Sequence, residues 1–186
     1  MIRTNVPHII FTILFFSFLI NYSAEAYWEP AKNGDKIILI RHSKAPGFGD
    51  PPGFRIKDCK TQRNLSKEGI DQSKKIGKLF QKNQIKIDQV LSSQWCRCKD
   101  TAKYAFKNYF EFSALNSTFQ SSFAKNEPKQ LKQLQTFVNN WDGDGGNLVL
   151  ITHYSIITAI TDAVPSSGEI VITDKEFNVL STIPTD

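Results

Sequence analysis

The sequence predicts an α/β fold, a three-layer sandwich with a mainly parallel central sheet. Three short runs rich in Ile, Leu and Val, at residues 36–40, 88–93 and 147–153, are apolar at consecutive positions and bounded by turn-forming residues. Such runs are typical of strands that a parallel sheet buries on both faces. Segments with helical periodicity separate the runs, and this alternation favours helices packed on a parallel sheet.

The first 26 residues have the three parts of a secretory signal peptide. Arg3 supplies a positive charge, residues 9–20 form an apolar stretch, and residues 24–26 form a small-x-small cleavage site. The apolar stretch, about 12 residues, is shorter than the roughly 20 that a spanning helix needs. We therefore expect cleavage after Ala26, a periplasmic or secreted protein without a stable membrane anchor, and one domain over residues 27–186.

The first half of this domain should contain two strands and two helices. After the strand at 36–40 comes a turn-rich segment, APGFGDPPGF. Ser66 can cap a helix over residues 66–81, in which Glu68 occupies the first turn and apolar residues recur at helical spacing. The strand at 88–93 follows, and then a helix over roughly 98–109.

The second half should continue the alternation and end in two strands. A helical period covers residues 128–140, and the turn WDGDGGN leads into the strand at 147–153. A further helix is expected over 154–164. Residues 168–174 and 177–183 are predicted to be a terminal pair of strands.

The formal net charge of +5 indicates attraction to anions, without choosing among them. The basic residues are scattered and lack the regular aromatic residues of a single-strand binder, so we expect no nucleic-acid partner. An adhesin for anionic surfaces, dependent on net charge alone, is an alternative.

Three cysteines, Cys59, Cys96 and Cys98, lie in a chain expected to reach an oxidising compartment. Because a bridge between Cys96 and Cys98 would close a very tight loop, we expect Cys59 to pair with one of them. A metal site is the alternative, but one C-x-C pair with a distant cysteine falls short of a zinc framework.

Charged residues collect at the predicted strand ends. Arg41 and His42 follow the first strand, Arg97 follows the second, and His153 ends the third. Ligands of open α/β sheets bind beyond the carboxyl ends of strands, so these four side chains should meet. Arginine matches phosphate oxygens with a planar fork of donors, and imidazole can attack phosphorus as a nucleophile.

These residues resemble four motifs of the histidine phosphatase superfamily, the phosphoglycerate mutase-like or RHG-motif family. L-x-R-H-G is matched by LIRHS, R-x-L-[ST]-x-x-G by RNLSKEG, and S-S-x-x-x-R-x-x-x-T-A by SSQWCRCKDTA. The late strand with a second histidine is matched by LVLITH. APGFGDPPGF, DCKTQRNLS and SSQWCRC further resemble an exported bacterial branch.

The resemblance implies a phosphoglycerate mutase-like fold and a metal-independent phosphatase that needs no cofactor. It would hydrolyse phosphomonoesters or phosphoramidates through a phosphohistidine on His42. Arg41, Arg97 and His153 would bind and stabilise the phosphoryl group. The partner would be a small phosphorylated substrate, and export makes an envelope sugar phosphate one candidate.

The chain departs from the family pattern at two places. Ser43 replaces the usual glycine after the histidine, so its backbone must avoid positive φ. Members that hydrolyse esters usually supply a carboxylic acid to the leaving group, yet Asn116 and Ser117 occupy its usual neighbourhood and Tyr154 follows His153. Three carboxyls are candidates to substitute: Glu127, Asp50 and Asp58. A leaving group that is already good would remove the need.

Two assignments stay open between structure and function. Arg63 can reach the pocket, but a surface ion pair with Asp58 is the favoured reading because exposed pairs are common. The turn-rich segment should form a pocket wall through Phe48 and Phe54. A catalytically weak phosphate-binding or envelope-interaction protein on the same fold is the alternative to an enzyme.

Overall fold

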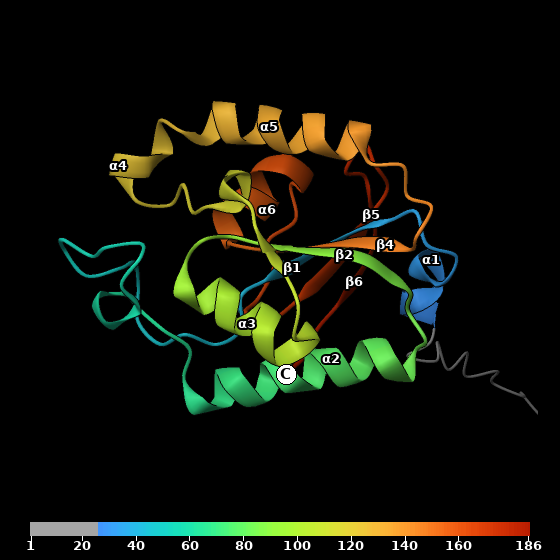
Figure 1. Cartoon of the computed structure of the whole chain (residues 1–186), viewed down its shortest axis with the longest axis horizontal. Helices are drawn as coiled ribbons and strands as arrows, with labels where there is room; N and C mark the ends of the chain where they lie inside the picture. Colours follow the sequence, from blue (N-terminus) through green and yellow to red (C-terminus); the bar gives the residue numbers. More distant parts are fainter. Residues whose placement is uncertain (1–25) are drawn as a thin grey trace, which may run out of the picture.

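The computed structural model describes residues 26–186, so the predicted signal peptide, apart from Ala26, lies outside the described residues. Within them, one sheet in the order β3-β2-β4-β1-β5-β6 carries helices on both faces (Figure 1). The strands are β1 (Ile37–Arg41), β2 (Ile87–Ser92), β3 (Phe110–Glu111), β4 (Asn147–Thr152), β5 (Ile170–Thr173) and β6 (Val179–Ile183). The first four pair in parallel, while β5 and β6 are antiparallel. The predicted three-layer, mainly parallel sandwich is confirmed.

Helices on both faces of the sheet complete the sandwich. The longer ones are α2 (Lys67–Lys82), α3 (Cys96–Phe106), α5 (Glu127–Asn140) and α6 (Tyr154–Thr161). Short turns are η1 (Ala26–Trp28), α1 (Glu29–Lys32), η2 (Cys59–Thr61), η3 (Ser113–Leu115) and α4 (Ser121–Ala124). None of the helices within residues 26–186 has the length and apolar character to cross a membrane.

The predicted elements occur in the predicted order, and several ends differ. Ser66 caps α2 as expected, because its Oγ accepts a hydrogen bond of 3.1 Å from the Gly69 N–H. The helix expected over 98–109 instead begins at Cys96 and ends at Phe106. The helix expected to reach residue 164 stops at Thr161, where Asp162 adopts a left-handed conformation with φ of 60°.

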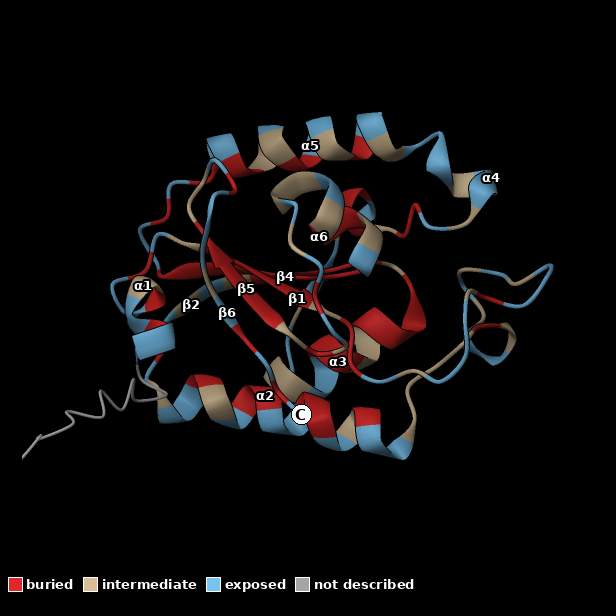
Figure 2. Ribbon diagram, turned by 180° about the vertical axis from the view of Figure 1, so that it is seen from behind, coloured by how far each residue is buried: buried red, intermediate tan, exposed pale blue. Residues whose placement is uncertain are grey.

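Alternating residues of the central strands pack into two separate hydrophobic cores, one on each face of the sheet. In β1, Ile38 and Ile40 pack toward α2 and α3, whereas Ile37 and Leu39 pack toward α5 and α6. Figure 2 shows the result as buried central strands, β1, β4 and β5, with buried stripes on the inner faces of α2 and α5. Burial on both faces explains why the strand sequences are apolar without alternation.

Three central strands end at one edge of the sheet. Arg41 of β1 lies opposite Thr152 of β4, and the His42 N–H extends this ladder by donating to the Thr152 carbonyl at 2.9 Å. The Ser93 N–H after β2 donates to the Ile151 carbonyl at 2.9 Å. The residues after β1, β2 and β4 therefore lie side by side, as the sequence predicts.

Candidate active site

Both strand-end histidines are buried and face each other at this edge. Each is only 3% exposed. Their ring centroids are 5.4 Å apart, and the rings stand at 68° to one another. The structure therefore brings together two imidazoles that are separated by more than half the chain.

The ring of His42 is held with one nitrogen free. Its Nδ1 lies 2.9 Å from the Ser43 carbonyl oxygen. A carbonyl oxygen can only accept, so Nδ1 carries the proton and donates, and Nε2 keeps its lone pair. Burial lowers the pKa of His42 well below its usual range, and the Arg97 guanidinium lowers it further. These effects keep the imidazole neutral and therefore nucleophilic.

His153 is oriented by a serine that follows β2. Its Nε2 lies 2.9 Å from Ser93 Oγ, which donates to Asn116 Oδ1 at 3.2 Å. Ser93 Oγ therefore accepts from Nε2–H, which turns Nδ1 toward Arg97 Nη2 at 3.4 Å. Burial lowers the pKa of His153 well below its usual range, followed by the charge of Arg97. The site thus holds two neutral imidazoles.

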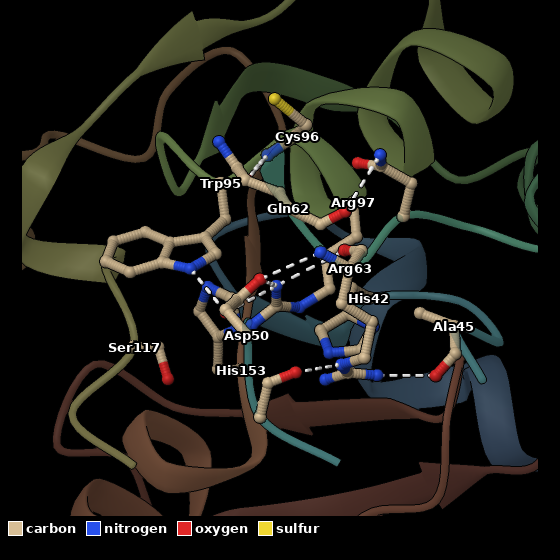
Figure 3. Close-up of polar contacts among 12 residues, drawn as sticks. His42, Ala45, Asp50, Gln62, Arg63, Trp95, Cys96, Arg97, Ser117 and His153 are labelled. Carbon is tan, nitrogen blue, oxygen red and sulfur yellow. Dashed lines mark hydrogen bonds and ion pairs between the residues drawn. The ribbon is translucent and has the colours of Figure 1, made fainter. Parts of the chain in front are cut away.

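Arg97 reaches the site from the first turn of α3 and forms a buried ion pair. Its Nη1 donates to Asp50 Oδ1 at 2.9 Å and to Oδ2 at 3.1 Å. The two side chains are 3% and 1% exposed. The indole Nε1 of Trp95 also donates to Asp50, at 3.0 Å, and Figure 3 shows Arg97 and Trp95 converging on this carboxylate.

Arg41 and Arg63 complete a cationic cluster. Arg41 Nη1 donates to the Pro165 carbonyl at 2.8 Å, and Arg63 Nε donates to the Gly49 carbonyl at 2.8 Å. Burial lowers the pKa of both arginines, and repulsion from Arg97 adds to it. The favoured surface pair between Arg63 and Asp58 is wrong, because Asp58 pairs with Arg55, three residues before it, and Arg63 lines the pocket.

Motif residues from α2 and α3 pack against the loop that follows His42. A Cβ on Gly69 would lie 2.0 Å from the Lys44 carbonyl oxygen, so only glycine lets α2 begin this close to the loop after His42. The Thr101 hydroxyl accepts from the Ser43 N–H at 3.0 Å. Ser43 has no positive φ and its hydroxyl accepts from Ser73 at 2.8 Å, so the loop accommodates a serine where a glycine was expected.

These groups line a cavity of about 510 Å³. Arg41, His42, Arg63, Arg97 and His153 all belong to its lining. A larger groove of about 840 Å³ runs along α5, but no histidine, arginine or cysteine lines it. The smaller cavity is therefore the candidate active site.

The turn-rich segment after β1 supplies part of the cavity wall. Phe48 is 88% exposed at the cavity and packs edge-on against Phe119 at 4.8 Å between ring centroids. Phe54 instead packs against Trp95 and Phe123, beside the apolar core and outside the cavity lining. The wall therefore presents Phe48, and the expectation that Phe54 also lines it is wrong.

Of the three acid candidates, only Asp50 lines the cavity. Both of its oxygens already accept hydrogen bonds, from Arg97, Trp95 and the Arg63 N–H. Asp58 pairs with Arg55, and Glu127 accepts from the Thr118 hydroxyl at 2.8 Å, both outside the cavity lining. Of Asn116 and Ser117, which occupy the neighbourhood where the resemblance leads us to expect an acid, Ser117 lines the cavity and Asn116 accepts hydrogen bonds from Ser93 and the Gln94 N–H.

The cysteines divide into one disulfide and one thiol. Cys59 is bonded to Cys96, with Cα atoms 5.6 Å apart, which resolves the alternative left open by the sequence. Cys98 is buried with Sγ 3.4 Å from His153 Nε2, and burial raises the pKa of its thiol to about 12. Among residues 26–186, no three His, Cys, Asp or Glu side chains gather in a way that could hold a metal ion.

Sequence reasoning missed the residues that hold the site in place. Ser93, which orients His153, is the second serine of SSQWCR, so the motif carried a signal for it. Trp95 lies in the same motif at a position that the pattern leaves free. The pairing of Asp50 with Arg97 had no sequence signal, because 47 residues separate them.

No family model and no curated protein matches the chain. Solved structures do. A protein histidine phosphatase SixA complexed with tungstate aligns with a TM-score of 0.53 at 14% identity, over 80% of this chain and 96% of that one. A candidate SixA phosphohistidine phosphatase from Agrobacterium tumefaciens has a TM-score of 0.58 at 16% identity, over 82% and 99%. Phosphoglycerate mutase from Thermus thermophilus gives 0.54 at 15%, over 81% and 99%. The chain therefore has the phosphoglycerate mutase-like fold.

Proposed function

We propose that this chain is a metal-independent phosphatase of the histidine phosphatase superfamily that acts through a phosphohistidine on His42. The observation that carries the proposal is the buried pair of neutral imidazoles beside three arginines in one cavity. The fold shared with phosphatases and a mutase supports the same chemistry.

Binding of the substrate rests on charge. The cavity lining holds the guanidinium groups of Arg41, Arg63 and Arg97 and the single carboxylate of Asp50, which leaves two positive charges when both histidines are neutral. A phosphate monoester carries close to two negative charges at neutral pH, because its second pKa is about 6. The SixA structure solved with tungstate, another tetrahedral oxyanion, supports such a ligand.

The reaction then takes two displacements at phosphorus. The lone pair of His42 Nε2 forms the N–P bond while the P–O or P–N bond to the leaving group breaks, and the leaving group departs with the bonding electrons and takes a proton from solvent. Water next attacks phosphorus, the N–P bond breaks, and the electrons return to Nε2. The guanidinium groups stabilise charge on the transferring oxygens in both steps.

His153 supplies a switchable donor to the phosphoryl group. Its Nδ1 faces Arg97, and its pKa is lowered by burial and by cationic neighbours. A bound dianion opposes those cations, so His153 can take up a proton and donate from Nδ1. This stabilisation grows as negative charge accumulates on the oxygens.

The surroundings of the cavity favour substrates with good leaving groups. The one carboxyl in its lining, Asp50, is occupied by Arg97 and Trp95. A phosphoramidate or an activated phosphomonoester departs with less help from an acid than an alkyl phosphate does. Phosphoramidates therefore come first, and an envelope sugar phosphate is a second substrate class that would need a proton from another group, such as solvent.

Export to the periplasm or cell exterior is part of the proposal. It rests on the signal-peptide pattern of residues 1–26 and on the Cys59–Cys96 disulfide, since disulfides persist in oxidising compartments. The turn-rich and cysteine-bearing segments, which resemble an exported bacterial branch, agree with this location.

Replacement of His42 by Ala tests the mechanism. Hydrolysis of p-nitrophenyl phosphate should fall by roughly 10³-fold or more, as when other catalytic nucleophiles are removed. The variant should still bind sulfate and keep the circular dichroism of the wild type, because the arginines remain. Turnover that persists in the folded variant would refute the nucleophile. Sulfate binding without turnover in the wild type would favour the binding-protein alternative.

A further inference from the structure

Asp50 is an unusual group to find in an anion-binding cavity. Its side chain is 1% exposed and its two oxygens accept four hydrogen bonds: two from Arg97 Nη1, one from Trp95 Nε1 and one from the Arg63 N–H. A carboxylate here repels the anion that the cavity should bind. Its presence therefore calls for a role that outweighs the repulsion.

The geometry of the ion pair shows what the carboxylate does to the arginine. Both oxygens of Asp50 lie on Nη1 of Arg97, at 2.9 and 3.1 Å, rather than on both arms of the fork. Nη2 is thereby turned away from Asp50 and lies 3.4 Å from His153 Nδ1, beside the two imidazoles. One arm is anchored, and the other faces the place of the phosphoryl group.

We propose that Asp50 is a positioning residue that fixes the Arg97 fork so that Nη2 points at the phosphoryl group between His42 and His153. This inference rests on the proposed function. It gives Asp50 a different role from the acid that the sequence suggested, because its oxygens are turned to Arg97 and Trp95. An arginine side chain has many rotamers, and anchoring one arm removes that freedom before the substrate arrives.

The segment that carries Asp50 is itself fastened to α3. The Cys59–Cys96 disulfide joins it to the first residue of α3, and Gln62 Oε1 accepts from the Cys96 N–H at 3.0 Å. Trp95, which donates to Asp50, lies just before that helix. The loop that carries Asp50 is therefore fixed to the start of the helix that carries Arg97, as expected if the relative position of the two side chains is important.

Sulfate binding to an Asp50→Asn variant tests the proposal, because a role through charge and a role through positioning predict opposite changes in the sulfate Kd. Were Asp50 only a nearby negative charge, its removal would tighten sulfate binding. We expect the sulfate Kd to rise about 10-fold or more, the loss of one charge-assisted hydrogen bond from a misplaced Arg97. A Kd equal to or below that of the wild type would overturn the inference. Glu111→Gln, which breaks the exposed pair with Lys99, is the matched control and should bind sulfate as the wild type does.

Hydrolysis separates the positioning role from the acid role. Loss of a general acid slows alkyl phosphates far more than aryl phosphates, whereas a misplaced Arg97 should lower kcat/KM by about 10²-fold for both. A loss confined to alkyl phosphates would make Asp50 the acid and overturn the proposal. Asp50→Glu should recover part of the activity.

A milder variant covers the case in which Asp50→Asn does not fold. Trp95→Phe keeps an aromatic ring beside His153 but removes the indole N–H, one of the two donors to Asp50 Oδ2. We expect the sulfate Kd to rise a few-fold; an unchanged Kd would count against the proposal. Failure of the proposed function looks different, since the wild type would then bind sulfate without turnover. A wild type that binds no sulfate would overturn both.

Discussion

Reduction of the Cys59–Cys96 disulfide should destabilise the protein substantially. The bond joins residues separated by 37 positions. By the chain-entropy relation, a loop of that length contributes about 4 kcal/mol to the free energy of unfolding. For a domain of this size each kcal/mol moves Tm by about 2–4 °C, so full reduction should lower Tm by roughly 10 °C.

The assay compares thermal unfolding, followed by circular dichroism, with and without a reductant, and a thiol titration confirms that the bond has opened. The disulfide fastens the segment bearing Asp50 and Arg63 to α3. Reduction should therefore also lower phosphatase activity at temperatures below the Tm, where the protein is still folded. A Cys59→Ser/Cys96→Ser variant should already have the lower Tm and should not respond to reductant. An unchanged Tm after confirmed reduction would refute the structural role of the bond.

Three further predictions concern pH, packing and the remaining thiol. Since the pKa values of His42 and His153 are lowered while unfolded histidine titrates near 6.5, stability should be complete above about pH 6.5 and fall below it, by about 1.4 kcal/mol per histidine per pH unit. Urea unfolding should show this loss between about pH 6.5 and 5, and an unaltered loss in His42→Asn/His153→Asn would contradict it. Gly77→Ala should lower the free energy of unfolding, measured in urea, by about 2 kcal/mol although Ala has the better helix propensity, because a Cβ at this position would lie 2.2 Å from the Ala105 carbonyl oxygen. The exposed Lys78→Ala is the control, and a stabilised Gly77→Ala variant would contradict the packing. The Cys98 thiol, whose pKa is raised to about 12 by burial, should resist iodoacetamide in the folded protein and react after unfolding; rapid labelling of folded protein would contradict its burial.

The sheet edge that carries the two histidines could be predicted because two physical rules combine there. Runs that are apolar at consecutive positions mark strands buried on both faces, and the carboxyl ends of parallel strands meet at one edge. His42 follows the first run and His153 ends the third, so the sequence alone predicts that the two lie near each other. The register that sets Arg41 opposite Thr152 agrees with that reasoning.

The side-chain partners could not be predicted in the same way. The surface pair of Arg63 with Asp58 is expected because exposed ion pairs are common, but Asp58 lies within reach of Arg55, and the Arg63 side chain turns to carbonyls of the loop after β1. The long pairing of Asp50 with Arg97 depends on the path of that loop. Its glycines and prolines indicate turns without specifying where a carboxylate ends up.

The choice between two cysteines depended on where one helix begins. Residues two apart on a helix point to nearly opposite sides. Since α3 begins at Cys96, this residue meets Cys59 in the loop while Cys98 faces His153 in the core. The sequence placed the helix start at residue 98, and an error of two residues was enough to leave the pairing undecided.

The most direct test of the account is to trap the phosphorylated protein. The wild type is mixed with an aryl phosphate, denatured at alkaline pH to preserve the acid-labile N–P bond, and mapped by mass spectrometry. We expect one phosphoryl group, on His42, and none in the His42→Ala variant. A phosphoryl group on another residue, or turnover in the absence of any phosphorylated protein, would contradict the central claim.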